Sequence, residues 1–177
     1  DARGPGVEVA QGVDAASLPA DAVVLSQAPV AHLLPVRIEG VAQPLEAAYA
    51  AVVAAQLTGA LEYALDLAVQ YVKDRVQFGK PIARNQAIQQ QLAVLAGEVA
   101  CSHAASATAL RDLPAIAHSE AARAEFSAAV AKVTASDAVK TGASIAHQVH
   151  GAIGFTHEYP LNFATRRLWA WRAEAGS

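Results

Sequence analysis

The stretch "LEAAYAAVVAAQLTGALEYALDLAVQYV", residues 45–72, decides the fold of this chain. Its apolar residues recur every three or four positions, which is the spacing of one face of an α-helix. This apolar stripe consists of Leu45, Tyr49, Val52, Val53, Leu57, Ala60, Leu61, Ala64, Leu65, Ala68, Val69 and Val72. The sequence therefore predicts one long amphipathic helix that begins near Pro44 and ends near Phe78.

The remainder of the chain repeats this pattern. A second helix is predicted from about Arg84 to Arg111, a third from about His118 to Val149, and a fourth after Pro160. Their stripes are Ile88, Leu92, Leu95 and Val99; Phe126, Val130, Val133, Ile145 and Val149; and Leu161, Ala164, Leu168 and Trp171. The breaks are short, and short breaks favour antiparallel neighbours. We predict an all-α, antiparallel four-helix bundle over residues 43–177.

The first 42 residues have a different pattern. "GVEVA" and "DAVVLS" are short, rich in valine and bounded by Gly, Pro or Asp, which predicts two strands. Two short strands are marginal on their own, so we interpret this segment as a remnant of a β-domain with its linker. The chain contains no methionine and starts at "DARGPGVEV", so we expect a processed or trimmed chain or a fragment.

Composition narrows the classes of function. The net charge is −3 and no basic stripe is visible, which argues against a nucleic-acid partner. No run reaches the roughly 18 consecutive apolar residues of a membrane span, so we expect no membrane partner. A single cysteine rules out a disulfide within the chain and makes the cytoplasm the default location.

The stretch "DRVQFGKP", residues 74–81, contains more than a helix stop. Gly79 and Pro81 suffice to end a helix, which leaves Arg75, Gln77 and Phe78 without an explanation. One interpretation is a solvated arginine, a polar surface residue and a core phenylalanine. The other is a phosphate clamp, because arginine matches phosphate oxygens with two parallel donors, glutamine adds a donor and phenylalanine adds an apolar wall.

The stretch "HQVHGAIGF", residues 147–155, is the second unusual motif. His147 and His150 are three residues apart, but no further ligand stands at a suitable spacing, so zinc is not expected. Gly151 is either a helix C-cap or a place where a ligand approaches the backbone, with Gln148 beside it. Earlier in the chain, Cys101 has no base on its own face and is predicted to be a small core residue.

Two stretches together resemble a known family. "YVKDRVQFGKPIARNQAIQQQLA" (residues 71–93) and "AHQVHGAIGFTHEYPLNFATRR" (residues 146–167) are similar to the C-terminal helical domain of the acyl-CoA dehydrogenases. The resemblance runs from about Pro44 to Ser177, and the valine-rich start resembles the last strands of that family's middle β-domain. It implies a flavoprotein whose FAD is shared between subunits of a homo- or hetero-oligomer.

The resemblance also implies roles for particular residues. Those that match the family's FAD contacts are Arg75, Gln77, Phe78, Asn85, Gln86, Gln148 and Gly151. Arg75, Gln77 and Phe78 would reach the FAD of a neighbouring subunit, and Gln148 and Gly151 would meet its adenosine end. Ala152 replaces the second glycine that is usual in this turn, and its methyl group would crowd the ligand.

The family's catalytic glutamate has no counterpart at its usual positions. The family removes a proton α to a thioester carbonyl, which requires a carboxylate beside the substrate carbon. Ala175 occupies the usual position of this base, and Tyr49 occupies the alternative position on the first helix. Glu174 is adjacent in sequence, but in a helix one residue is a rotation of about 100°. Glu46 shares a helix face with Tyr49.

The sequence thus predicts an acyl-CoA dehydrogenase-like chain that supplies FAD-binding and oligomer surface but lacks the usual catalytic glutamate. Some members of the family resemble this and pair with a subunit that carries the base, in the oxidation of fatty acyl or sterol side-chain thioesters of CoA. Two alternatives stay open. One is an active dehydrogenase fragment that uses Glu174 or Glu46, and the other is a non-catalytic interaction bundle without flavin.

Overall fold

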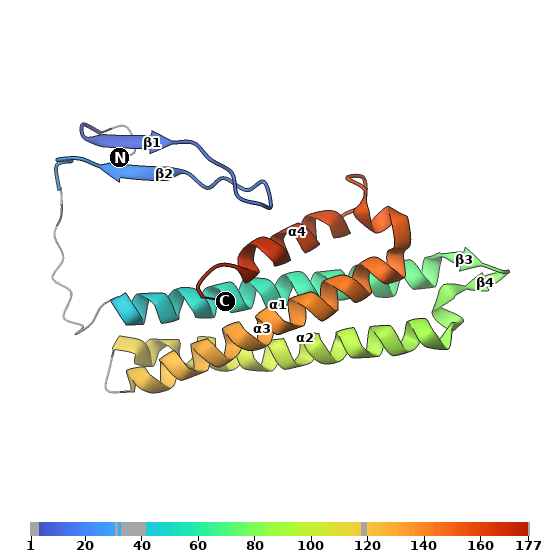
Figure 1. Cartoon of the computed structure of the whole chain (residues 1–177). Coiled ribbons are helices and arrows are strands. Elements are labelled where there is room, and N and C mark those ends of the chain that lie inside the picture. The colour runs from blue at the N-terminus through green and yellow to red at the C-terminus, as the bar shows by residue number, and fades with distance from the viewer. Residues whose placement is uncertain (1–3, 31, 33–41, 118–119, 177) are drawn as a thin grey trace.

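The structure is a computed structural model that describes residues 4–30, 32, 42–117 and 120–176. Its body is a bundle of α1 (Ala42–Asp74), α2 (Gln86–Asp112), α3 (Ala121–His150) and the shorter α4 (Leu161–Arg172). Successive helices run in opposite directions, and α4 covers part of the face formed by α1 and α3 (Figure 1). The predicted antiparallel four-helix bundle is confirmed.

Small residues fill much of the bundle core. Fully buried alanines of α1 and α3 face each other, among them Ala51, Ala54, Ala131, Ala135 and Ala138, with Leu57, Leu61, Leu95 and Leu168 between them. Alanine keeps helix propensity high and lets the helix backbones approach closely. Gly142 on α3 is tightly packed against α1, because an added Cβ would lie 2.6 Å from Leu61 Cδ2.

Some predicted core positions are wrong. Several apolar residues of the predicted stripes are exposed instead: Leu45, Tyr49, Val52, Phe126, Val130 and Val133. Cys101 is exposed as well, while its neighbour Ser102 is fully buried. The reason is that alanine stands on every side of these helices, so apolar spacing alone does not identify the buried face.

Helix α1 ends at Asp74 rather than near Phe78, which corrects the predicted boundary. Residues 76–81 form a small hairpin of β3 (Val76–Gln77) and β4 (Lys80–Pro81), followed by a 3₁₀ turn at Ile82–Arg84. The two-residue loop is Phe78–Gly79, with φ angles of 51° and 76°. Positive φ at both positions is typical of a type I′ turn. Gly79 therefore serves a hairpin and not a helix cap.

The two predicted N-terminal strands are present. β1 (Val7–Ala10) and β2 (Ala22–Leu25) pair antiparallel, with Val7 opposite Leu25. The loop between them is attached to α4, because the Arg166 guanidinium donates to Ser17 Oγ at 2.7 Å and to the Ala15 carbonyl at 3.2 Å. The connection to α1 at residues 33–41 lies outside the described residues, so the domain boundary at residue 42 stays a prediction.

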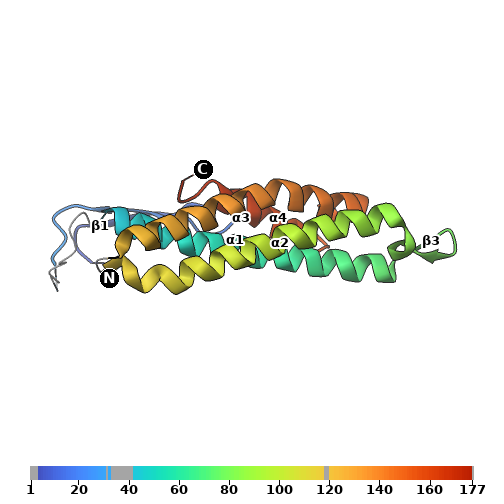
Figure 2. The same ribbon diagram turned by 90° about the horizontal axis from the view of Figure 1, so that it is seen from below.

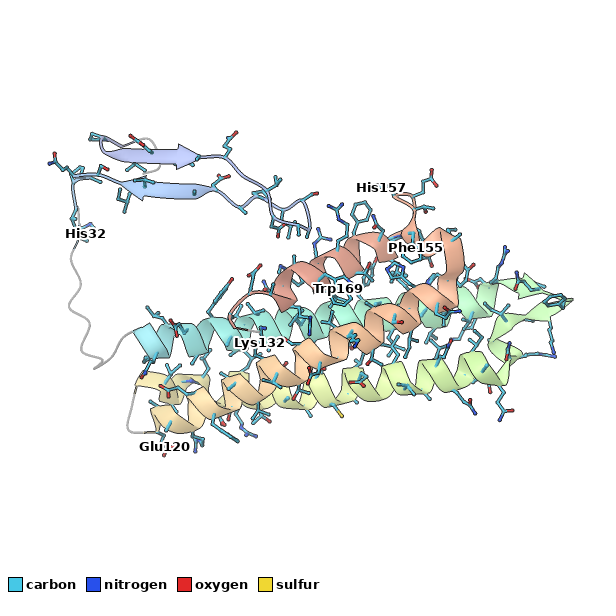
Figure 3. All side chains as sticks on the ribbon, in the orientation of Figure 1. His32, Glu120, Lys132, Phe155, His157 and Trp169 are labelled. Carbon is cyan, nitrogen blue, oxygen red and sulfur yellow. The ribbon has the colours of Figure 1, made fainter. Side chains whose placement is uncertain are left out.

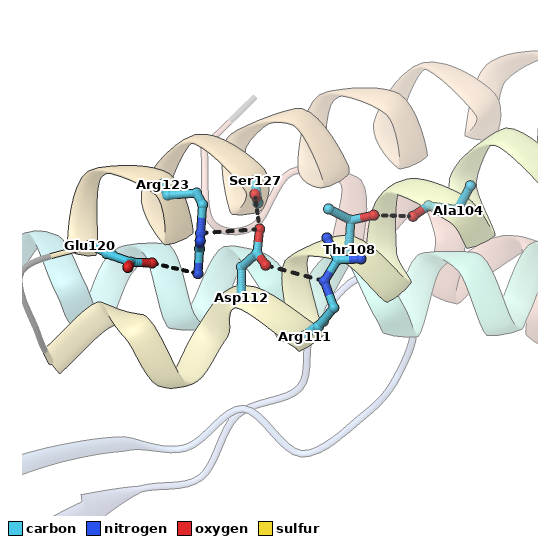
Figure 4. A network of polar contacts seen from close by, with 7 residues as sticks. All are labelled: Ala104, Thr108, Arg111, Asp112, Glu120, Arg123 and Ser127. Atoms are coloured by element: carbon cyan, nitrogen blue, oxygen red, sulfur yellow. Dashed lines mark hydrogen bonds and ion pairs between the residues drawn. The ribbon is translucent and has the colours of Figure 1, made fainter.

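A polar network closes the end of the bundle where α2 meets α3 (Figure 4). Ser127 Oγ donates to the buried Asp112 carboxylate at 2.7 Å, and Arg111 Nε lies 3.3 Å from its other oxygen. Arg123 reaches both Asp112 and Glu120. The Ser127 hydrogen bond, followed by the two arginines, lowers the pKa of Asp112. The predicted start of the third helix, His118, lies outside the described residues.

Helices α1 and α2 are long and apolar enough to cross a membrane by length and composition. Their apolar residues, such as Leu57, Leu61 and Leu95, instead pack together in the bundle core. Within the part of the chain that the structure describes, only 39% of the apolar window of α1 and 28% of that of α2 are buried, so the bundle core accounts for part of their hydropathy.

Candidate functional site

The β3–β4 hairpin projects beyond the bundle at one end, as Figure 2 shows. It carries the residues that the sequence singles out: Arg75, Gln77 and Phe78 are all exposed, and Phe78 has 99% of its surface open to solvent. A core role for Phe78 is therefore wrong. The Arg75 backbone is fixed at both atoms, with its amide bonded to the Tyr71 carbonyl and its carbonyl bonded to the Ile82 amide. The side chains are left available to a ligand.

The backbone of Phe78 is strained. A left-handed conformation is uncommon for a bulky side chain, and Asn or Gly would relieve the strain at this position of a type I′ turn. The ring gains no packing in return, since it is almost completely exposed. Backbone strain that is not offset by packing of the side chain is typical of functional positions.

Asn85 and Gln86 stand where the 3₁₀ turn passes into α2. Asn85 is the N-cap of α2, and its side-chain oxygen accepts a hydrogen bond from the Ala87 amide at 3.0 Å. The cap uses the oxygen of this amide and leaves its NH₂ group. Gln86 is exposed on the first turn of the helix. The structure thus gives Asn85 a local role and places both residues near the hairpin.

The second motif lies at the end of α3. Gly151 is the C-cap with φ 65°, and a Cβ added to it would meet nothing within 4 Å. Gln148 and Gly151 line a cavity of about 470 Å³ together with His147, Lys140 and Ser144. Phe155 and Trp169, both exposed, complete its wall (Figure 3). Gly151 therefore ends the helix, and the open space beside its backbone is compatible with a ligand, whose approach stays a prediction.

The core holds the two motifs at the same end of the molecule. Val72 on α1 and Val149 on α3 share one apolar cluster, against which Ile82 and Ala83 from the root of the hairpin also pack. The Tyr71 ring stacks on the His150 ring with 4.6 Å between centroids. These contacts join the two segments that a ligand spanning both motifs would have to reach.

The two histidines of the motif are structural in this arrangement. His150 is buried, and its Nδ1 lies 2.7 Å from the Ala146 carbonyl. His147 stacks on Phe155, and its Nε2 lies 2.9 Å from Thr165 Oγ1. Burial lowers the pKa of both imidazoles, and for His147 the nearby His150 adds to the effect. Each ring joins α3 to a neighbouring segment.

The two places where a catalytic carboxylate would stand converge. Helix α4 ends at Arg172, and the chain then turns with positive φ at Ala175 and Gly176. Ala175 packs against the core, while the Tyr49 hydroxyl donates a hydrogen bond to the Glu174 carboxylate. This hydrogen bond is the main reason why the pKa of Tyr49 is raised. Residue 174 lies beyond the end of α4, so the helical rotation of about 100° per residue does not apply to it.

Glu46, the other candidate base, is exposed and lines a second cavity of about 540 Å³. This cavity lies between the first half of α1, the first half of α3 and the C-terminal turn. Lys132, which the sequence reasoning missed, also lines it and is only 4% exposed. The sequence did contain a hint of this burial, because Lys132 directly follows Ala131 in a segment of α3 that is rich in alanine.

The comparisons with known proteins agree with this geometry. The family model described as "Acyl-CoA dehydrogenase, C-terminal domain" matches residues 47–177. The chain is 37% identical over 151 residues to acyl-CoA dehydrogenase FadE34 of Mycobacterium tuberculosis, covering 85% of this chain and 20% of that protein. It is 39% identical over 111 residues to an acryloyl-CoA reductase (NADH) of Anaerotignum propionicum, covering 62% of this chain and 26% of that protein.

Solved structures share the fold. Butyryl-CoA dehydrogenase from Megasphaera elsdenii superposes with a TM-score of 0.84 at 27% identity, covering 99% of this chain and 46% of that chain. The ChsE4–ChsE5 complex of Mycobacterium tuberculosis gives a TM-score of 0.83 at 24% identity, covering 98% of this chain and 46% of that chain. The present chain spans about a fifth to a quarter of the curated relatives named above. It belongs to the acyl-CoA dehydrogenase family and corresponds to the C-terminal helical domain of its members.

Proposed function

We propose that this chain is part of a flavin-dependent acyl-CoA dehydrogenase and supplies FAD-binding and oligomer surface without the usual catalytic glutamate. Bound FAD would supply the hydride acceptor for α,β-dehydrogenation of an acyl-CoA thioester. The chain's own residues bind and orient that group. Arg75 and Gln77 donate to phosphate or sugar oxygens, and Phe78 provides an apolar wall.

The observation that carries this proposal is the exposure of Phe78 at 99% in a strained turn that projects from the bundle. A ring in this position contacts almost nothing of its own chain. Its counterpart has to come from outside, which favours a flavin held mainly by another subunit. The open backbone of Gly151 and the cavity beside Gln148 fit the far end of such an extended ligand.

The assignment of a supporting role to the chain rests on Ala175 and Tyr49. A methyl group accepts no proton, and a phenol whose pKa is raised above its ordinary value is a poor base at neutral pH. The base would then belong to a partner, either another copy or a distinct subunit. We also propose that the substrate is an acyl-CoA, that the chain assembles with other acyl-CoA dehydrogenase subunits, and that the enzyme acts in the cytoplasm.

The test begins with the native complex, purified with its flavin absorbance and subunit masses recorded together. Arg75→Ala is expected to weaken flavin binding by roughly ten- to a hundredfold, the value of one charge-assisted hydrogen bond. Arg84→Ala is the matched control, because Arg84 is also an exposed arginine at this end of the bundle. Unchanged flavin content in the Arg75 variant would refute the role of Arg75 as a flavin contact, and a native complex without flavin would favour an interaction bundle.

A second candidate function is an active dehydrogenase that uses Glu174. The observation in its favour is the hydrogen bond from Tyr49, which brings the Glu174 carboxylate to the alternative base position. Glu174→Gln would then lower turnover by roughly a hundred- to ten-thousandfold, the usual contribution of a general base. Glu46→Gln serves as the comparison. Unchanged turnover in both variants would exclude catalysis by this chain's own carboxylates.

A further inference from the structure

Lys132 of α3 is a buried lysine whose ammonium group donates three hydrogen bonds. Its Nζ donates to the Gly176 carbonyl at 2.6 Å, to Ser136 Oγ at 2.9 Å and to the Arg172 carbonyl at 3.0 Å. An ammonium group has three donors, and here each has an acceptor. The arrangement explains how a charge is tolerated at 4% exposure, since a buried charge without partners is strongly unfavourable.

Two of the three acceptors are the last carbonyl of α4, at Arg172, and the carbonyl of Gly176 in the turn that follows it. The last carbonyls of a helix have no partner within the helix, and Lys132 satisfies the one at Arg172. Its contact with Gly176 then fixes the other side of the turn, where Ala175 and Gly176 both have positive φ. Arg172 adds a reciprocal bond from its Nε to the Ser136 carbonyl at 3.0 Å. The turn is thus attached to α3 at both of its ends.

Glu174 lies between these two attachment points, and its carboxylate accepts the hydrogen bond from Tyr49 on α1. We propose that Lys132 is a positioning residue: by holding the carbonyls of Arg172 and Gly176, it sets the C-terminal turn and brings Glu174 to Tyr49. The inference goes beyond the proposed function, because it concerns this turn and holds whether or not the chain binds flavin. Under this proposal, Lys132 determines the position of Ala175 and the hydrogen bond of Tyr49, which are the residues at the two candidate base positions.

The test replaces Lys132 with methionine in the full chain, and Lys140→Met is the matched control on an exposed turn of the same helix. Amide hydrogen exchange at Ala173 and Glu174 is expected to accelerate by about tenfold or more in the Lys132 variant, since two charge-assisted bonds to the turn are lost. The phenol of Tyr49, followed as the absorbance difference from Tyr49→Phe, should titrate at a lower pH once Glu174 is released.

A combination of variants separates positioning from general loosening. In a Glu174→Ala background, Lys132→Met should leave the Tyr49 titration unchanged, because the acceptor of the Tyr49 hydrogen bond is already absent. Parent-like exchange at the turn and a parent-like Tyr49 titration in the folded Lys132 variant would overturn the proposal. If that variant does not fold, a measurement on the parent protein tests the proposal instead. Ammonium protons of Lys132 should exchange far more slowly than those of Lys140 in NMR spectra, and equal rates would overturn it too.

Discussion

The ring of Tyr71 stacks on the ring of His150, with 4.6 Å between centroids and 28° between planes. Tyr159 approaches the same imidazole at 5.0 Å, so the His150 side chain is enclosed by two aromatic rings. This contact joins the last turn of α1 to the last turn of α3. The hairpin that carries Gln77 and Phe78 follows this turn of α1, whereas Gln148 lies within this turn of α3 and Gly151 directly after it.

Stability is expected to decrease in mild acid because of this enclosure. Burial lowers the pKa of His150 and His147 in the folded chain, while in the unfolded chain they titrate near 6.5. Below about pH 6.5 the unfolded state takes up protons that the folded state resists. The melting temperature should therefore be constant above that pH and fall as pH decreases toward the folded pKa values.

The control is a variant with His147→Gln and His150→Gln together, which removes both groups. Its melting temperature should vary less between pH 6.5 and pH 5 than that of the parent. An equal slope in parent and variant would show that these histidines do not govern the acid response. The Asp112 network contributes only at lower pH, because its carboxyl pKa is lowered from an ordinary value near 4.

Phe78→Asn is expected to separate stability from ligand binding. Asparagine tolerates the left-handed conformation of a type I′ turn, and the exposed ring makes no packing contact to lose. The free energy of unfolding of the chain should rise by about 1 kcal/mol in denaturant titrations. Flavin content of the assembled complex should fall. The control is Phe126→Asn, which replaces an exposed phenylalanine of α3 and should leave flavin content unchanged. A loss of flavin from the Phe126 variant would argue against a specific role for Phe78.

Gly142→Ala is expected to destabilise the bundle. The added methyl group would lie 2.6 Å from Leu61 Cδ2 and 3.1 Å from Leu95 Cδ1, and both leucines are fully buried. Overpacking of this kind lowers the free energy of unfolding by about 1–3 kcal/mol. Gly97→Ala on α2 is the opposite case, since its added methyl group meets nothing within 4 Å. That variant should gain about 0.5–1 kcal/mol, and a loss of similar size in both would refute the close-approach argument.

The bundle itself was predictable, because apolar residues recur at helical spacing and the helix-breaking residues fall between these stretches. The hairpin at residues 76–81 was not, because Gly79 and Pro81 are equally compatible with the end of a helix and with a tight turn. Exposure was misjudged at Cys101 and Phe126, where neighbouring alanines hide the boundary of the buried face. Two of the three partners of Lys132 are backbone carbonyls, which leave no trace in residue identities.

The N-terminal hairpin has a practical consequence. Among the described residues its sheet contains only β1 and β2, and Val23, Val24 and Leu25 are all more than half exposed. A short valine-rich ribbon with two open edges is a template for pairing with other chains. We therefore expect concentrated solutions of the isolated chain to aggregate through this ribbon. A version that begins at α1 should remain soluble at higher concentration.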